Sequence, residues 1–226
     1  TGLSEPLRSG VDVADYFRQL VVDCLDVLGV ERALVIGSSS GGSLALRAAA
    51  EHPSRISDLV LMGTPGMLEE LGTPFAERLM LLPGIGSLLG RLRPGTKTQL
   101  KMWRSIGHGA SLDEGRLETT YLEWWGALLE HTDSLRNDMA AMGMLRGRLG
   151  SYAPEHLVGP SERSRISAPT LLVWGENETF ADRNVADALV TSIPNAEMRL
   201  VKGGGHLPWI DAPGEVAAMI EELVAV

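Results

Sequence analysis

The sequence is poor in cysteine, in positive charge and in long apolar runs, and each shortage excludes a class of protein. Cys24 is the single cysteine among 226 residues, so the chain cannot form an internal disulfide, and we expect it in a reducing, cytoplasmic compartment. A net charge of -9 leaves no surplus of lysine and arginine for the phosphate backbone of a nucleic acid. No apolar stretch reaches the length of a membrane-spanning helix, so we expect no membrane span.

The remaining composition is typical of a single globular domain. Hydrophobic residues make up 44% of the chain and charged residues 22%, which is enough apolar material for one sizeable core. Residues 12–28 place apolar side chains at helical spacing, and this pattern predicts a helix that buries Cys24 on its apolar face.

Strand and helix patterns alternate at both ends of the sequence. Short apolar runs predict strands at residues 32–37, 58–63 and 170–174, and a fourth predicted strand starts at Ala196. Helical patterns separate these runs. Such alternation is typical of an α/β protein with a parallel sheet and helices on both faces.

The middle of the chain has a different pattern. Strand signals vanish there, and glycine and proline interrupt several short helical patterns. The clearest of these predicts a helix over residues 112–131 with Trp124 on its apolar face. We therefore predict a helical cap at residues 66–165, inserted into an α/β core formed by residues 1–65 and 166–226.

A Gly-Ser-Ser-Ser-Gly segment stands between a predicted strand and a predicted helix. It fits the G-x-S-x-G pattern of a nucleophile elbow, a tight turn that exposes its central serine, here Ser39. Gly37 and Gly41 give the strand and the helix the room that their close approach needs. The helix starts at once, so its first N–H groups, including that of Ser40, are available to bind the oxyanion of a tetrahedral intermediate.

Three other interpretations of this segment deserve comparison. A flexible linker is not expected between a strand and a helix. A phosphate-binding loop needs a lysine where this chain has Ser43. A shifted register, with Ser40 as the nucleophile between Ser38 and Gly42, stays open.

A serine nucleophile needs a base, and the base needs an orienting acid. His206 follows the fourth predicted strand on a glycine loop, as a base at the active edge would. Four histidines lie at a helix end or within the predicted cap and are set aside: His52, His108, His131 and His156. The acid is expected after the preceding strand, where Glu176 and Glu178 are the candidates. Ser39, Glu178 and His206 then follow the Ser…Asp/Glu…His order of one hydrolase class.

Together these segments resemble the α/β-hydrolase superfamily, in its branch with a helical cap. The stretch "VIGSSSGGSLALRAAAEHPSRISDLVLMGTPG" is similar to the family's elbow and the helix and strand after it. "ISAPTLLVWGENE" is similar to its acid-bearing loop, and "IPNAEMRLVKGGGHLPWIDAPGEV" to its histidine loop and last helix. The opening "TGLSEP" is similar to the glycine-rich loop that ends the family's fourth-strand region. The resemblance implies the α/β-hydrolase fold and neither a metal nor an organic cofactor.

The sequence departs from the family pattern in two respects. The family usually has aspartate at the acid position, where this chain has Glu178, whose side chain is one methylene longer. The family's first strands are missing, and so is the His-Gly loop that supplies a second oxyanion N–H. We therefore expect the chain to be part of a longer protein, a processed subunit completed by a partner chain, or a fragment.

The resemblance implies a serine hydrolase that cleaves a carboxylic ester or a related acyl bond. Ser39 is the expected nucleophile, His206 the base, Glu178 the orienting acid and the Ser40 N–H an oxyanion donor. The leucine-, methionine- and tryptophan-rich cap predicts a small, mostly apolar acyl substrate, with three tryptophans as candidate pocket residues: Trp103, Trp124 and Trp125. An acyltransferase, a cofactor-free haloperoxidase-like enzyme and a non-catalytic ligand-binding relative are the alternatives.

Overall fold

A computed structural model describes residues 5–8, 10–73 and 75–225, so the first four residues of the opening "TGLSEP" lie outside the described residues. The described strands form one sheet in the order β1-β2-β3-β4, and every neighbouring pair is parallel. This confirms the predicted parallel sheet. The strands are β1 (Ala33–Ser38), β2 (Ile56–Met62), β3 (Thr170–Gly175) and β4 (Ala196–Val201).

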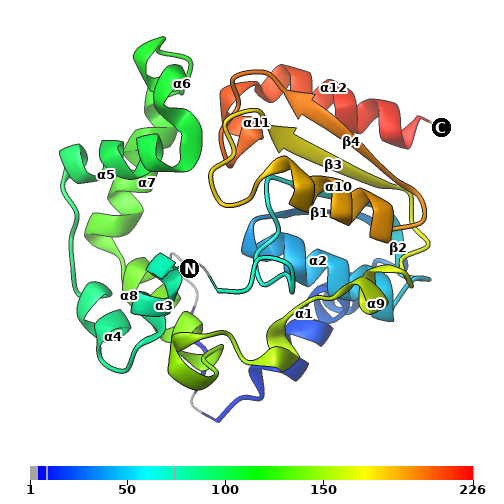
Figure 1. Cartoon of the computed structure of the whole chain (residues 1–226), viewed down its shortest axis with the longest axis horizontal. Helices are drawn as coiled ribbons and strands as arrows, with labels where there is room; N and C mark the ends of the chain where they lie inside the picture. The colour runs from blue at the N-terminus through cyan, green and yellow to red at the C-terminus, as the bar shows by residue number, and fades with distance from the viewer. Residues whose placement is uncertain (1–4, 9, 74, 226) are drawn as a thin grey trace.

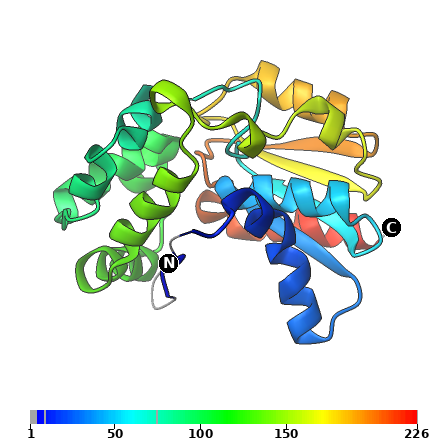
Figure 2. The ribbon, with the colours of Figure 1, turned by 90° about the horizontal axis from the view of Figure 1, so that it is seen from below.

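Helices cover both faces of this sheet, as the alternation of patterns predicts. Figure 2 shows α10 above the strands and α12 below them. Side chains of one strand alternate between the two layers: Leu59 and Leu61 pack in the cluster of α2 and α10, whereas Val60 packs in the cluster of α12. The helices around the sheet are α1 (Val13–Leu28), α2 (Ser40–Glu51), α10 (Arg183–Ser192), α11 (Pro208–Asp211) and α12 (Pro213–Val224).

The chain between β2 and β3 is mostly helical. We call residues 66–165 the insert, and its larger helices lie together on the left of Figure 1, beside the sheet. Their bounds, with three short turns of helix, are α3 (Phe75–Leu81), α4 (Ile85–Leu89), α5 (Thr96–Trp103), η1 (Arg104–His108), α6 (Gly109–Asp113), α7 (Thr119–His131), α8 (Ser134–Met144), η2 (Arg148–Gly150), η3 (Pro154–His156) and α9 (Pro160–Arg163). The last of these, α9, packs against α2 and α10. The division into core and cap at these boundaries stays a prediction.

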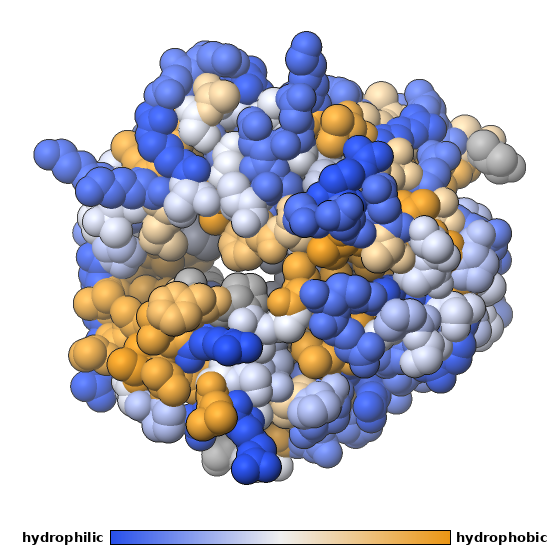
Figure 3. All heavy atoms as spheres, viewed as in Figure 1, coloured by the Kyte–Doolittle hydropathy of each residue, from blue (hydrophilic) through white to orange (hydrophobic). Residues whose placement is uncertain are grey.

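The surface is hollowed between the insert and the sheet, as Figure 3 shows. The same view shows apolar side chains gathered over the insert. Among the exposed apolar residues of the insert, Phe75 is 78% exposed, Leu88 61% and Leu149 96%. Within the described part of the chain, no helix combines the length and the apolar character that crossing a membrane requires.

The expectation that Cys24 is buried is wrong, because the structure exposes it. Helix α1 packs on α2, and its buried side chains include Ala14, Val22 and Leu25. That face is rotated away from the one that the apolar spacing indicated, so Cys24 and Leu28 turn to solvent.

The helix predicted over residues 112–131 is also wrong in its first part. Helix α6 ends at Asp113, and α7 begins only at Thr119. Gly115 lies between them with a φ of +66°, a left-handed conformation that a helix does not contain. Trp124 is 53% exposed, and the buried side of α7 carries Leu129 instead.

Candidate active site

The sharp turn at Ser39 joins the end of β1 to the start of α2. Ser39 has φ +52° and ψ -123°, a strained conformation for a residue with a side chain, and it raises the hydroxyl above the carboxyl end of the sheet. Gly37 permits this turn, because a Cβ there would lie 2.5 Å from the carbonyl oxygen of Gly41. The role expected for Gly41 is different in the structure: a Cβ on Gly41 would meet nothing, and the tight contact is between Gly42 and Pro65.

The structure brings Ser39 and His206 together from distant parts of the chain. Ser39 Oγ lies 2.9 Å from His206 Nε2, within hydrogen-bond reach of a nucleophile and its base. His206 follows β4 and the glycine loop, and it is 4% exposed. Ser40 makes no such contact among the described residues, because it already begins α2.

Glu178 completes a chain of hydrogen bonds with His206. Its carboxylate oxygens lie 2.8 and 3.0 Å from His206 Nδ1, and its side chain is 1% exposed. An ionised carboxylate only accepts, so Nδ1 carries the proton and Nε2 is free to accept the proton of Ser39. The extra methylene of glutamate therefore does not prevent contact with the imidazole.

Backbone N–H groups fix the position of this carboxylate. Thr64 donates to Oε2 at 2.9 Å, and Thr179 and Phe180 donate to Oε1 at 2.8 and 2.9 Å. Burial alone would raise the pKa of Glu178, but the hydrogen bond and electrostatic interaction with His206, with these N–H donors, hold the pKa below its ordinary value. Glu178 is therefore ionised at neutral pH and able to stabilise a protonated His206.

Glu176, the other acid candidate, has a different position. Its carboxylate accepts a hydrogen bond from the N–H of Gly203 at 2.8 Å and so ties the end of β3 to the glycine loop. Of the two acids that the sequence offers, the structure brings Glu178 and not Glu176 to His206.

Gly63 lies directly beneath the loop of His206, at the end of β2. It has a φ of +69°, and a Cβ there would lie 2.0 Å from the carbonyl oxygen of His206. We expect Gly63→Ala to lower the free energy of unfolding by about 2–4 kcal/mol, because the side chain adds a clash to backbone strain. The kcat of any reaction that uses His206 as its base should fall as well, because the clash displaces that side chain.

The matched control for this variant is Gly29→Ala. Gly29 has a φ of +67°, and a Cβ there would meet nothing within 4 Å. This control should lower the free energy of unfolding in urea by only about 1 kcal/mol and leave kcat unchanged. Equal losses of stability in the two variants would contradict the role of the clash.

A second buried histidine and acid support the same loop, with His108 on η1 of the insert and Asp211 on α11. His108, fully buried, lies with Nδ1 2.8 Å from Asp211 Oδ2, and Gly205 N–H donates to that same oxygen at 2.8 Å. The N–H of Leu207 donates to His108 Nε2 at 3.3 Å, and the N–H of His206 donates to the carbonyl oxygen of Ile106 at 2.9 Å. Hydrogen bonds to acceptors on η1 and α11 thus fix the backbone N–H groups of Gly205, His206 and Leu207.

Neither His108 nor Asp211 is predicted from the sequence to support the site. The one signal in the sequence is that Asp211 stands a few residues after His206. Its partner His108 is 103 residues away, so no local pattern connects the two side chains. Burial alone would raise the pKa of Asp211, but its hydrogen bond with His108 lowers the pKa below the ordinary value. Asp211 is therefore ionised and accepts from both His108 and Gly205.

Asp211 is not expected to contact substrate, so Asp211→Asn should act by loosening the position of His206. The amide has no charge, and it places an NH2 donor at one of the two oxygen positions, both of which lie within 3.0 Å of His108 Nδ1, so we expect the free energy of unfolding to fall by about 1–3 kcal/mol. We expect kcat of a reaction that uses His206 as its base to fall by roughly 10- to 100-fold with KM nearly unchanged, because misplacing the base affects the chemical step. Asp113→Asn, at an exposed aspartate paired with Arg104, is the control. A change in KM with kcat preserved would contradict a positioning role.

A small cavity of about 40 Å³ opens at Ser39 Oγ. The core contributes Ser40, Phe180 and His206, and the insert contributes Met67 and Leu71 to its apolar wall. The tryptophans expected to line the substrate pocket are not among the residues around this cavity. Trp103 is 3% exposed and packs in an apolar cluster that joins the insert to Ile210 of α11, and Trp125 packs against the same cluster.

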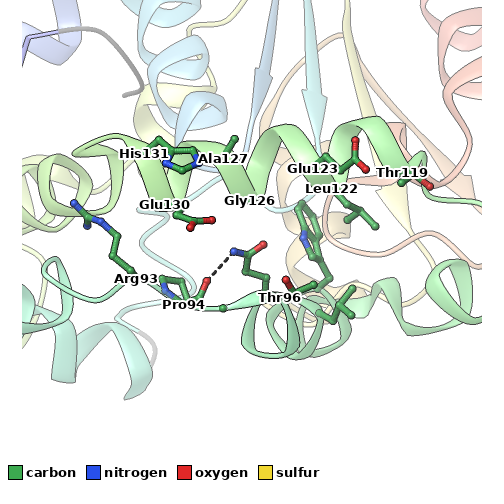
Figure 4. A pocket seen from close by; sticks show the side chains of 14 residues that line it. Arg93, Pro94, Thr96, Thr119, Leu122, Glu123, Gly126, Ala127, Glu130 and His131 are labelled. Atoms are coloured by element: carbon green, nitrogen blue, oxygen red, sulfur yellow. Dashed lines mark hydrogen bonds between the residues drawn. The ribbon is translucent and has the colours of Figure 1, made fainter.

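A larger cavity of about 630 Å³ lies within the insert, between α5 and α7. Figure 4 shows Glu123, Glu130 and His131 of α7 on one side and Pro94 on the other. The side-chain amide of Gln99, which also lines this cavity, donates to the carbonyl oxygen of Pro94 at 2.7 Å. No residue lines both this cavity and the one at Ser39. Over the described residues, no group of three or more histidine, cysteine, aspartate or glutamate side chains is placed to hold a metal ion.

The chain is similar to a family of known fold and to curated hydrolases. The sequence profile of the alpha/beta hydrolase fold family matches residues 2–213. A relative from Cupriavidus pinatubonensis, named 2-hydroxy-6-oxononadienedioate/2-hydroxy-6-oxononatrienedioate hydrolase, is 28% identical over 211 residues. A relative from Pseudomonas putida, named 2-hydroxy-6-oxononadienedioate/2-hydroxy-6-oxononatrienedioate hydrolase 2, is 31% identical over 206 residues. These matches cover 91% and 90% of this chain but only 66% of each relative, so the chain spans slightly less than two thirds of their length.

Solved structures show the same fold at low sequence identity. A serine hydrolase from Cycloclasticus zankles, a bacterium that degrades polyaromatic hydrocarbons, has a TM-score of 0.71 and 22% identity, covering 97% of this chain and 74% of that one. The meta-cleavage product hydrolase CumD from Pseudomonas fluorescens IP01 has a TM-score of 0.71 and 16% identity, covering 99% of this chain and 76% of that one.

Proposed function

The chain belongs to the alpha/beta hydrolase fold family, and from that membership we propose that it is a serine hydrolase that cleaves a carboxylic ester or a related acyl bond. The observation that carries the proposal is the continuous hydrogen-bonded chain from Ser39 Oγ through His206 to Glu178. A serine hydroxyl is a weak nucleophile by itself, and this arrangement supplies both the base and the acid that orients the base.

In the proposed reaction, Ser39 Oγ attacks the carbonyl carbon of the substrate as His206 Nε2 takes the hydroxyl proton. The bond to the leaving group then breaks, and His206 gives that proton to the departing alkoxide. Water next attacks the acyl-enzyme, transfers a proton to His206 and releases the acid, and the proton returns to Ser39. Glu178 stabilises the imidazolium in both halves of the cycle.

The N–H of Ser40 is the proposed oxyanion donor. It lies at the first position of α2, where a helix has no intrahelical acceptor for its N–H groups and carries partial positive charge. Ser39 and Ser40 both line the small cavity, so a carbonyl oxygen bound there could lie near this N–H. The insert is the proposed cap over the site, and its Met67 and Leu71 suit an apolar acyl group.

A second candidate is hydrolysis of a carbon–carbon bond beside a ketone. The named substrates of the two curated relatives contain no ester, and their 6-oxo group is the carbonyl that a serine would attack. The same three side chains would serve, with His206 giving its proton to a carbanion in place of an alkoxide. The similarity to those relatives is the observation that favours this candidate.

Labelling with a fluorophosphonate, which phosphonylates activated serines, tests the proposal, with the modified peptide located by mass spectrometry. We expect label on Ser39, none in Ser39→Ala and full label in Ser40→Ala. Label on Ser40 would mean that the register of the elbow is different. A para-nitrophenyl ester and a 2-hydroxy-6-oxodienoate, assayed side by side, then separate the two candidate reactions. A folded protein that neither reacts with the label nor hydrolyses either substrate would overturn the proposal in favour of a non-catalytic relative.

A cytoplasmic location is part of the proposal. The exposed thiol of Cys24 is consistent with a reducing compartment, where a free cysteine stays reduced.

A further inference from the structure

A carboxylate and a phenol from the insert meet inside the cavity that contains Ser39. Glu77 lies on α3 and Tyr152 follows η2, and the tyrosine hydroxyl donates to Glu77 Oε2 at 2.7 Å. Both side chains line the cavity together with Ser39 and His206. We propose that this pair is a substrate-binding subsite that accepts an uncharged hydrogen-bond donor, such as a hydroxyl, and rejects a carboxylate. This inference rests on the proposed function.

The charges around the cavity support this selectivity. Among the described residues that line it there is no lysine or arginine, and Glu77 is the one carboxylate. A carboxylate on the substrate would find no lysine or arginine to pair with and would face the like charge of Glu77 in a poorly solvated space. The curated relatives are named for dioates, which carry two carboxylates. This cavity is therefore suited to a less acidic substrate than theirs.

One oxygen of Glu77 remains available to a ligand. Tyr152 occupies Oε2, whereas Oε1 has no hydrogen-bond partner among the residues that the structure describes. The tyrosine itself is held in place, because it is 8% exposed and its N–H donates to Thr73 Oγ1 at 2.9 Å. A substrate hydroxyl that donates to Oε1 would complete the pair without moving it.

Burial makes the pair costly in the absence of a ligand. It raises the pKa of Glu77, against the lowering effects of the Tyr152 hydrogen bond and the charge of His206. Burial and the neighbouring carboxylate also raise the pKa of Tyr152. An acid whose pKa is raised on folding destabilises the folded state above its unfolded pKa, and this effect vanishes as the pH falls below that value. A side chain retained at such a cost is typical of a binding site.

Glu77→Gln should therefore be more stable than the wild type at neutral pH. Glutamine still accepts the hydrogen bond of Tyr152 but carries no charge. We expect its Tm to exceed that of the wild type by about 1–3 °C at pH 7.5, with the difference disappearing near pH 4. This measurement also establishes that the variant folds, so its substrate preference can be interpreted.

Three para-nitrophenyl esters of equal acyl length test the subsite: those of heptanoic acid, omega-hydroxyhexanoic acid and adipic acid, which end in methyl, hydroxyl and carboxylate. In the wild type we expect kcat/KM to be highest for the hydroxyl ester and at least about tenfold lower for the carboxylate ester. Glu77→Gln should raise the ratio of the carboxylate ester to the methyl ester by about tenfold. Glu123→Gln, which removes an equal charge from the other cavity of the insert, should leave that ratio unchanged.

Binding of the same esters to Ser39→Ala, measured by calorimetry, separates this inference from the proposed function. That variant keeps both members of the pair, so its dissociation constants should follow the order hydroxyl, methyl, carboxylate even if the wild type hydrolyses none of the three. Two results together would overturn the subsite: the carboxylate ester binds Ser39→Ala at least as tightly as the other two esters, and Glu77→Gln leaves the kcat/KM ratio of the carboxylate ester to the methyl ester unchanged. Loss of hydrolysis with the binding order preserved would overturn only the proposed reaction.

Discussion

Replacing Ser39 by alanine is expected to lower kcat for a para-nitrophenyl ester by about 10⁴- to 10⁶-fold. The Ser39 hydroxyl is the atom that lies 2.9 Å from His206 Nε2, and no other serine hydroxyl contacts that nitrogen among the described residues. The fold should persist, because the variant loses only a part-buried hydroxyl whose hydrogen bond contributes about 1 kcal/mol to stability. Initial rates and thermal unfolding of the same preparation measure both effects.

The neighbouring serine provides the control for this prediction. Ser40→Ala removes a hydroxyl from the same turn but keeps the backbone N–H proposed as oxyanion donor. We expect it to retain kcat within about tenfold, since its side chain takes no part in the proton transfer. If Ser40→Ala were as inactive as Ser39→Ala, the assignment of the nucleophile would be wrong.

Replacing Glu178 by glutamine should have the second largest effect. Glutamine has nearly the same shape, but its amide nitrogen can present a donor to His206 Nδ1 and favours the wrong tautomer of the imidazole. We expect kcat to fall by about 10³- to 10⁴-fold. Rapid kinetics with a para-nitrophenyl ester should show that both the formation and the hydrolysis of the acyl-enzyme become slower, because His206 is the base in both steps.

Glu178→Asp separates charge from reach. It keeps the carboxylate but shortens the side chain by one methylene, so it cannot keep both the His206 bond and the bonds to Thr64 and Phe180. We expect an activity between those of wild type and Glu178→Gln. An aspartate variant with full activity would mean that the loop adapts freely and that the longer side chain has no special fit.

Glu178→Gln should also change the stability of the folded protein in a way that depends on pH. The pKa of Glu178 is lower in the folded chain than in the unfolded one, so its ionised form stabilises the fold above the unfolded pKa. That contribution is lost as the pH falls through the lowered value. The difference in free energy of unfolding between wild type and Glu178→Gln should therefore be constant near neutrality and shrink below about pH 4. A difference that grows on acidification would contradict the lowered pKa.

The sequence was sufficient to predict how the sheet brings Ser39, Glu178 and His206 together. Each follows a predicted parallel strand, and the carboxyl ends of parallel strands meet at one edge of a sheet. Apolar runs and a G-x-S-x-G segment are local signals, so the strands and the elbow were within reach of pattern analysis. The assignment of these side chains to catalysis remains a proposal that the variants above test.

The features that the sequence did not predict depend on packing between distant segments. Glu77 and Tyr152 belong to different elements of the insert, and nothing in the pattern around either residue indicates the other. Cys24 shows a related failure: apolar spacing identifies a stripe on α1, but contact with α2 decides which side of that stripe is buried. When a helix carries apolar residues on several sides, contact with its neighbour decides which side is buried, and the apolar period alone does not.

The insert separates β2 from β3 along the chain, and this separation affects the order in which the protein folds. Strands β1 and β2 are joined through α2, and β3 and β4 through α10, whereas the pairing of Leu59 with Thr170 bridges more than a hundred residues of chain. Closing that long loop costs more entropy than closing either short one, by about 0.6 kcal/mol for each doubling of length. The two halves of the sheet should therefore form early and separately, and their union should be the slow step. Ser39 belongs to one half and both Glu178 and His206 to the other, so the proposed site would be assembled only at that last step.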